Sequence, residues 1–252
     1  LQAQGDLRSG LLSYAAGVFN GIPDGTSSST EVDTNGGKDL AGRVRIQPLR
    51  AARFATGVFA GLGVHIGGSV GHQEGPLPAF RTSVGQQYFS YAPDAAASGT
   101  RRRVSPALFY YRGPFGGFVE YMRTTHEVAQ HGVSQPVTTE AWEATGSLLV
   151  TGEPASERGV RPLKAFDPTR GQWGGVQLLS RYANLRVHTD RPLPTWAAAT
   201  ASTRAESFTL AVNWYPSAYI KYYVTFERTS FGGGLQRRSA ERTVTVRTQI
   251  AF

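Results

Sequence analysis

Arginine dominates the chemistry that this sequence could perform. Of its 26 lysine and arginine residues, only three are lysines. A guanidinium group stays charged at any physiological pH and presents a planar fork of donors that matches a phosphate or a carboxylate. A formal net charge of +8 first suggests a nucleic-acid binder. The arginines are scattered along the whole chain, however, which fits a basic channel for an anionic solute better, so we expect no nucleic-acid partner.

A subset of the basic residues alternates with apolar residues in runs that read as strands, which predicts that they point into a common interior: Arg43, Arg45, Arg181, Lys221 and Arg247. An oxyanion in a pore needs several charge-assisted donors that replace its hydration shell without trapping it. Carboxylates share the same polar faces, at Glu120, Glu143 and Glu227. Two interpretations therefore stay open, because these cations could bind a passing anion or pair with the carboxylates and brace the wall.

Other patterns that could support catalysis or metal binding are weak. The G-x-S-x-G match at Gly67–Gly71 lies inside a continuing strand, whereas a nucleophile elbow needs a sharp turn before a helix. His65 and His72 lie seven apart in one strand and face opposite sides, and His126 and His131 lack a ligand pattern around them. Without cysteine there is no thiolate site. We expect no catalytic residue, no metal, no cofactor and no enzymatic activity.

The elements that would position the basic residues are β-strands. Apolar and polar residues alternate with period two along the chain, and in the closing run Val244, Val246, Ile250 and Phe252 share one face. A soluble sandwich would show the same alternation. Aromatic residues near the strand ends and tight turns that alternate with long polar loops favour an outer-membrane barrel instead. No stretch approaches 18 consecutive apolar residues, so no transmembrane helix is predicted.

The predicted strands cover most of the chain: Leu11–Phe19, Leu40–Gln47, Gly61–Gln73, Val104–Tyr111, Phe115–Arg123, Glu140–Thr151, Gly174–Leu185, Ala205–Tyr215, Tyr219–Arg228 and Glu241–Phe252. Leu1–Gly5 reads as the tail of an earlier strand. The long polar loops include Glu74–Arg103 and Thr125–Thr139. If Phe252 ends at the periplasmic rim, these loops lie outside the cell. Gly152–Trp173 then becomes a periplasmic connection that is too long for the short-turn rule of such barrels.

Several stretches are similar to the phosphate-selective porin O/P family, in the order in which the family has them: Tyr14–Gly21, Gly68–Tyr91, Ser105–Thr124, Thr151–Glu153, Ala165–Val187, Leu210–Phe231 and the closing RTVTVRTQIAF. This resemblance covers essentially the whole chain. It implies an all-β transmembrane antiparallel barrel with 16 strands, located in the bacterial outer membrane and associated as a homotrimer. The chain, residues 1–252, would form one barrel domain that holds about 10–11 of those strands and lacks the N-terminal ones.

The resemblance also implies two segments folded into the pore, an external loop at 74–103 and a periplasmic segment at 152–173. Basic residues along the lumen form the family's ladder for phosphate. Carried over onto this chain, the external loop would hold Arg81 and the run Arg101, Arg102 and Arg103. The periplasmic segment would hold Arg161 and Lys164.

The leading hypothesis is an outer-membrane porin that gives passive, anion-selective diffusion of phosphate or a similar oxyanion through an arginine-lined lumen. Its partners would be small anions, outer-membrane lipid and lipopolysaccharide, and further copies of the chain. A general or organic-anion diffusion porin is the first alternative. A structural barrel that anchors an acidic surface partner is the second. A hydrolase barrel would need a converging Ser, His and carboxylate set, which the sequence does not offer.

Overall fold

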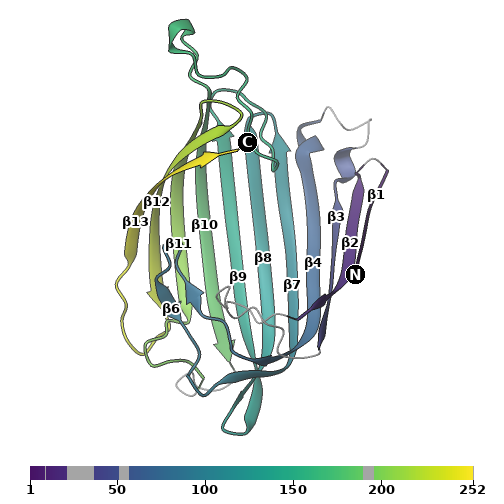
Figure 1. Ribbon diagram of the computed structural model, residues 1–252, viewed down its shortest axis with the longest axis vertical. Coiled ribbons are helices and arrows are strands. Elements are labelled where there is room, and N and C mark those ends of the chain that lie inside the picture. Colours follow the sequence, from purple (N-terminus) through teal and green to yellow (C-terminus); the bar gives the residue numbers. More distant parts are fainter. Residues whose placement is uncertain (9, 22–36, 51–56, 190–195, 252) are drawn as a thin grey trace.

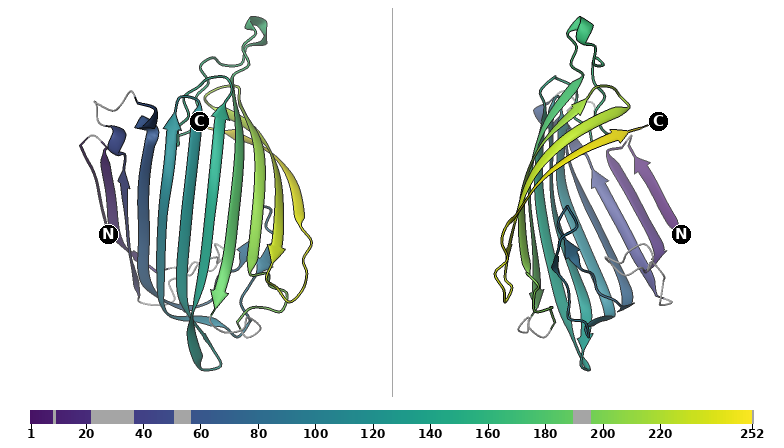
Figure 2. Two further views of the ribbon diagram at one scale, coloured as in Figure 1. Left: turned by 180° about the vertical axis from the view of Figure 1, so that it is seen from behind. Right: turned by 60° about the vertical axis from the view of Figure 1, so that its left-hand side comes forward.

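A computed structural model of the chain describes residues 1–8, 10–21, 37–50, 57–189 and 196–251. These residues form one antiparallel sheet of eleven strands, in which each strand pairs with the next long strand along the chain. The sheet curves strongly around an interior that we call the lumen (Figures 1 and 2). Among the described residues, no helix is both long and apolar enough to cross a membrane. The all-β antiparallel fold with about 10–11 strands is confirmed.

The strands of this sheet are β1 (Gln2–Leu7), β2 (Leu12–Asn20), β3 (Lys38–Ile46), β4 (Leu62–Gly75), β7 (Ala96–Arg112), β8 (Phe115–Gln130), β9 (Val133–Leu149), β10 (Gly175–Thr189), β11 (Arg204–Tyr215), β12 (Ile220–Gly232) and β13 (Glu241–Ile250). A separate small hairpin consists of β5 (Phe80–Arg81) and β6 (Gln87–Phe89). Short 3-10 helices lie at η2 (Pro48–Arg50), η4 (Val58–Gly61) and η5 (Pro168–Arg170). Phe252, which ends the predicted closing strand, lies outside the described residues.

The two faces of the sheet differ in chemistry, because successive side chains of a strand point to opposite sides. On the outer face, Val212, Val224 and Val246 lie opposite one another on three neighbouring strands, and all three are exposed. On the inner face, Thr209 on β11 lies directly opposite Glu227 on β12, and the Thr209 hydroxyl donates a hydrogen bond to the Glu227 carboxylate. An exposed apolar face around a polar interior is the arrangement of a wall that meets lipid outside and water inside.

The sheet has two rims that are connected differently. At one end, which we call the turn rim, Gly113 and Pro114 join β7 to β8. At the opposite end, the loop rim, His131 and Gly132 join β8 to β9, with φ angles of 51° and 75° as a two-residue hairpin turn of type I′ requires. The predicted loop Thr125–Thr139 is therefore wrong, because both strands continue in register through this polar sequence to the turn.

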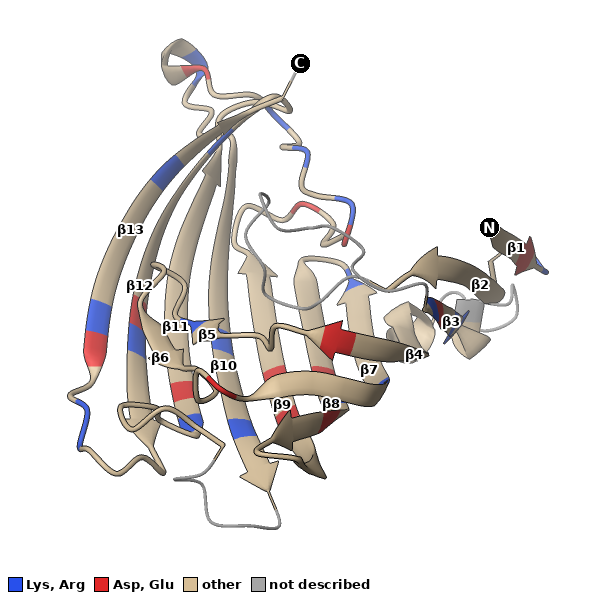
Figure 3. Cartoon of the chain, turned by 60° about the horizontal axis from the view of Figure 1, so that its bottom comes forward, with Lys and Arg blue, Asp and Glu red and all other residues tan. Residues whose placement is uncertain are grey.

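The segment between β4 and β7, residues 76–95, folds back inside the curved sheet and carries β5 and β6 (Figure 3). Phe89 is 1% exposed and packs in the largest buried cluster, which the segment shares with the inner faces of β8 to β11 and with residues 196–205. Backbone hydrogen bonds tie it to that second stretch, from Ser202 N–H to Tyr88 C=O at 2.7 Å and from Ala92 N–H to Trp196 C=O at 2.8 Å. The inserted segment is thus part of a packed core.

A second long segment, residues 150–174, joins β9 to β10 at the turn rim. Its carboxylate at Glu153 is 1% exposed and accepts hydrogen bonds from the Leu163 N–H and the Thr151 hydroxyl. The segment ends at Gly174, where an added Cβ would lie 2.4 Å from the Tyr215 carbonyl oxygen, so only glycine fits there. Part of the segment, including η5, extends beyond the rim (Figure 1). Another part reaches the wall at β3.

Candidate functional site in the lumen

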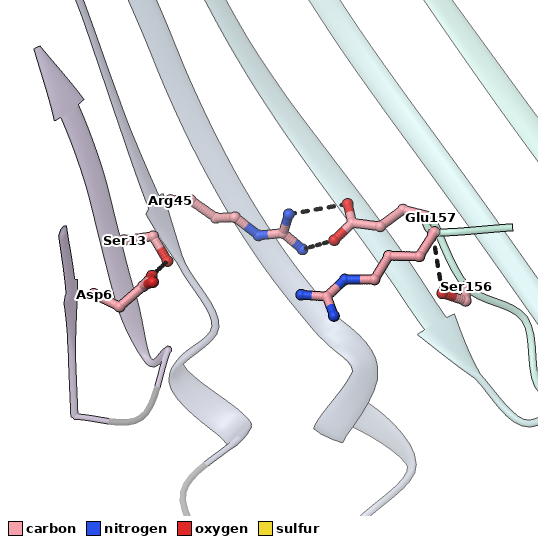
Figure 4. Close-up of polar contacts among 6 residues, drawn as sticks. Asp6, Ser13, Arg45, Ser156 and Glu157 are labelled. Carbon is pink, nitrogen blue, oxygen red and sulfur yellow. Dashed lines mark hydrogen bonds and ion pairs between the residues drawn. The ribbon is translucent and has the colours of Figure 1, made fainter. Parts of the chain in front are cut away.

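The contact that brings segment 150–174 to the wall is an ion pair between Arg45 and Glu157 (Figure 4). The guanidinium of Arg45 on β3 holds both carboxylate oxygens of Glu157, at 2.9 and 2.7 Å. The same guanidinium lies over the Phe109 ring, 4.0 Å from its centroid. This two-point geometry fixes the segment against the wall. Because the Glu157 carboxylate neutralises the positive charge of Arg45, this arginine braces the wall in this structure and does not present a free charge to a solute.

Arg45 and Glu157 line a pocket of about 560 Å³ in the lumen, the Arg45 pocket, whose other polar lining includes Arg43, His65 and Asp6. Asp6 accepts a hydrogen bond from the Ser13 hydroxyl on the next strand (Figure 4). Among the described carboxylates, none lies within ion-pair distance of Arg43. This arginine is therefore the cation of the pocket that a passing anion could meet.

A second pocket of about 400 Å³, the hairpin pocket, lies between the inserted segment and the wall and is lined by Arg81, Tyr88, Glu120, Glu143, Arg181 and Glu227 among others. Arg181 pairs with Glu143 on the neighbouring strand. Burial raises the pKa of the Tyr88 hydroxyl to about 12, so this group stays neutral at working pH. The charged groups of the hairpin pocket are thus its arginines and its glutamates, so the lining carries both signs of charge.

The inserted segment is anchored to carboxylates of the far wall. The Ser83 hydroxyl donates to Glu227 at 2.6 Å, and the Thr82 hydroxyl donates to Glu241 at 3.2 Å. Arg81, predicted as an anion ligand, lies on this segment as expected and donates to the Gly85 carbonyl at 3.1 Å. It lines the hairpin pocket, so the structure places it beside the lumen.

The run Arg101, Arg102 and Arg103 is not on the inserted segment, and that prediction is wrong because β7 already begins at Ala96. Arg101 faces inward, is 3% exposed and pairs with Asp39 at 2.6 Å. Arg102 faces the outer side, opposite Val70 and Thr125. Arg103 faces inward opposite Ser69. Alternation within a strand separates these arginines and leaves Arg102 out of the pore lining.

The remaining predicted residues gather toward the turn rim. Lys221 and Arg247 point inward from β12 and β13, and both lie over the Tyr223 ring, at 5.1 and 5.5 Å from its centroid. Arg161 and Lys164 are exposed on segment 150–174, which contacts the turn after β11 through a hydrogen bond from Phe166 N–H to Pro216 C=O at 2.7 Å.

Glu157 and Asp39, the acidic partners that decide which arginines remain available, were not predicted from the sequence. Their partners lie 112 and 62 residues away along the chain. Asp39 lies an even number of residues from Arg43 and Arg45 in the same strand, which could have indicated that its carboxylate also points inward. Glu157 lies in an irregular segment, where no periodicity indicates a direction.

An exposed apolar wall, a polar charged lumen and segments folded inside it define a porin-type wall of the outer membrane. The chain belongs to the phosphate-selective porin O and P family, whose sequence model matches residues 13–252. The family is one of channels rather than enzymes, and its members are bacterial outer-membrane proteins. A search of curated protein sequences finds no match.

Among solved structures, the chain is similar in fold to the in-vitro folded OmpT, an outer membrane protein of Vibrio cholerae. The TM-score is 0.52 at 12% sequence identity, and the match covers 98% of this chain and 60% of that one. The trimer form of OmpT gives a TM-score of 0.49 at 14% identity, covering 98% and 61%. The chain thus spans about 60% of the length of the solved structures that it matches.

Proposed function

We propose that this protein forms a water-filled pore that passes small anions, phosphate or a similar oxyanion, in preference to cations. The observation that carries the proposal is the positive charge of the lumen toward the turn rim. Within the described part of the chain, no carboxylate lies within ion-pair distance of Lys221 or Arg247. Arg161 and Lys164 add exposed positive charge on the segment at the same rim. A passage lined by one sign of charge raises the local concentration of the opposite ion.

The geometry supports weak binding followed by release. Lys221 and Arg247 sit on aromatic faces and keep access to water, so they can replace part of an anion's hydration shell without enclosing it. Arg43 offers a further cation at the Arg45 pocket. An anion would move between such separated sites, which allows it to leave again.

A specific observation favours a second candidate, a general diffusion porin. The hairpin pocket holds Glu120, Glu143 and Glu227 beside Arg81 and Arg181. A constriction with both signs of charge discriminates weakly between anions and cations, because the two fields partly cancel along the axis of passage. The anion-selective pore would owe its selectivity to the cations at the turn rim, whereas the general diffusion porin would have no marked selectivity for either sign of charge.

We also propose that the loop rim faces the outside of the cell, that the turn rim faces the periplasm, and that copies of the chain associate as a homotrimer in contact with outer-membrane lipid and lipopolysaccharide. The short turns after β7 and β11 at the turn rim, and the inserted segment 76–95 at the loop rim, support this orientation. The tight turn between β8 and β9 and the long segment 150–174 are the exceptions to that pattern. The family resemblance supports the trimer. Chemical crosslinking of the protein in native outer membranes tests it, and a monomer throughout would reject it.

Planar-bilayer recording of the full-length protein tests the proposed function. We expect a reversal potential in a salt gradient that reports anion selectivity, and a chloride conductance that falls when phosphate is added. The double variant Lys221→Gln and Arg247→Gln removes both turn-rim cations, so we expect the anion-to-cation permeability ratio to fall severalfold. Cation selectivity of the unmodified pore, or a permeability ratio that the double variant leaves unchanged, would reject the proposal.

Arg102 provides the matched control. The substitution Arg102→Gln also removes one positive charge, but from a side chain on the outer face. Its permeability ratio should equal that of the unmodified protein. A fall would show that the charge of the whole protein, rather than the lining of the lumen, sets selectivity.

The Arg45–Glu157 pair allows a test with opposite signs. Glu157→Gln releases the positive charge of Arg45 into the lumen, so we expect a higher permeability ratio and stronger block by phosphate. Arg45→Gln releases the negative charge of Glu157, so we expect the ratio to fall. The pair is 29% and 45% exposed, and stability should change by only about 1 kcal/mol or less. The double variant should return close to the starting ratio, and shifts of the same sign in both single variants would contradict this account.

A further inference from the structure

A row of arginines lies on the outer face of the sheet near the loop rim. Arg123, Arg186 and Arg204 project outward from β8, β10 and β11, and the cross-strand register places Arg186 directly opposite Arg204. Arg228 and Arg242 form a second directly opposite pair on β12 and β13. All five side chains are exposed, and Figure 3 shows blue segments near the loop-rim ends of β10 to β13. We call these five residues the arginine belt.

Aromatic side chains of the same face lie next to Arg123, Arg186 and Arg204, on the turn-rim side of these three arginines. Tyr121 lies opposite Trp142, and the Trp142 and Tyr182 rings contact each other with centroids 4.9 Å apart. Phe208 follows on β11, opposite Tyr182 and 44% exposed. A girdle of aromatic rings marks the boundary between hydrocarbon and headgroups in a membrane barrel. Arg123, Arg186 and Arg204 therefore lie beyond this girdle, at the height of lipid headgroups. Arg228 lies directly opposite Phe208 and so borders the girdle itself.

Two carboxylates lie on the outer face beside the belt, and both are engaged by other groups. Glu206, two residues from Arg204 on β11, accepts a hydrogen bond from the Asn184 amide at 3.2 Å. Glu140 lies opposite Arg123 and Arg186, but its carboxylate also accepts from the Tyr121 hydroxyl at 2.8 Å and contacts His188 at 3.1 Å. Like charges directly opposite on neighbouring strands destabilise a sheet. As far as the described residues extend, no carboxylate lies within ion-pair distance of Arg186, Arg204, Arg228 or Arg242. An anionic group from outside the chain would relieve both repulsive pairs.

We propose that the arginine belt binds the phosphate groups of a phosphorylated glycolipid headgroup in the outer leaflet. Adjacent guanidinium groups on neighbouring strands form a fork that suits a phosphate, because each offers two parallel donors. The apolar face on the turn-rim side of the belt contacts the acyl chains, and the aromatic girdle lies at the boundary between acyl chains and headgroups. This assignment rests on the proposed orientation of the loop rim. It is independent of ion passage, because the belt faces away from the lumen.

Titration of the full-length protein in zwitterionic detergent micelles with bis-phosphorylated lipid A tests the proposal. The double variant Arg186→Gln and Arg204→Gln removes one repulsive pair, so it should fold as well as the starting protein. An arginine near an anionic lipid surface contributes about fivefold in affinity, so we expect roughly 30-fold weaker binding of lipid A. Raising the salt concentration should weaken binding to the starting protein much more than to the variant.

The matched control is Arg158→Gln with Arg170→Gln, which removes two exposed charges from segment 150–174 at the other rim. It should bind lipid A with unchanged affinity. Inorganic phosphate at the same concentration should not displace the lipid, which separates a headgroup site from a free-anion site. Equal binding of dephosphorylated lipid A would overturn the proposal. So would full affinity of the belt variant, or a control variant that loses as much. Because these titrations measure no ion flow, their outcome is separate from that of the bilayer recordings.

Discussion

Replacing Phe89 by alanine is expected to loosen the inserted segment, residues 76–95, and to raise the single-channel conductance. Phe89 is 1% exposed, stacks on Phe80 with ring centroids 5.4 Å apart, and meets the Tyr91 ring edge-on at 5.1 Å. Removing a buried phenyl ring costs about 3–5 kcal/mol, from lost burial and from the cavity left behind. That energy holds the segment to the inner wall, so its loss should widen the pore.

Conductance steps in planar bilayers and the rate of proteolytic cleavage within residues 76–95 measure this effect. Phe89→Leu, which keeps most of the volume, should cost under about 1.5 kcal/mol and leave conductance nearly unchanged. Val84→Ala at the exposed tip of the same hairpin should change neither quantity, because Val84 is 47% exposed. If Phe89→Ala kept both the original conductance and the original resistance to cleavage, the buried cluster would not be what positions the segment.

The fold could be predicted from the sequence because a sheet with one apolar and one polar face imposes a two-residue alternation on every strand. The alternation around Val224 and Val246 indicated the outer face, and the structure has both residues there. The extension of β8 and β9 to the turn at His131 could not be recognised, because beyond Arg123 both strands leave the lipid-facing pattern and carry polar residues. Strands that project past the membrane lose the hydrophobic signal although their backbone pairing continues.

The candidate site was predictable only in part, for a related reason. Alternation correctly indicated the side to which Arg45, Arg181 and Lys221 point, because that depends on the local strand alone. Whether an inward arginine is available to a solute depends on the presence of a carboxylate partner, which can come from any part of the chain. Glu157 reaches Arg45 across 112 residues, a relation that no local pattern contains. The alternative that arginines brace the wall therefore describes Arg45 and Arg181 in this structure.

The substitution Arg101→Met is expected to destabilise the protein by about 3–5 kcal/mol, because it leaves a buried carboxylate without its counter-charge. Asp39 is 7% exposed and pairs with Arg101 at 2.6 Å, and it also accepts a hydrogen bond from the Gln73 amide at 3.3 Å. It sits where Gly71 has no side chain, since an added Cβ there would lie 1.6 Å from a carboxylate oxygen. Unfolding of the refolded protein in detergent by heat or denaturant measures the loss.

The double variant Arg101→Met with Asp39→Leu separates a structural role from anion binding. Replacing both members of a buried ion pair by apolar residues is often close to neutral for stability, so we expect most of the lost stability to return. Because Arg101 is 3% exposed and directed at Asp39, the restored double variant should also keep the anion-to-cation permeability ratio and the phosphate block of the unmodified pore. A stable double variant with reduced phosphate block would instead place Arg101 among the residues that a passing anion contacts, as the family resemblance first implied.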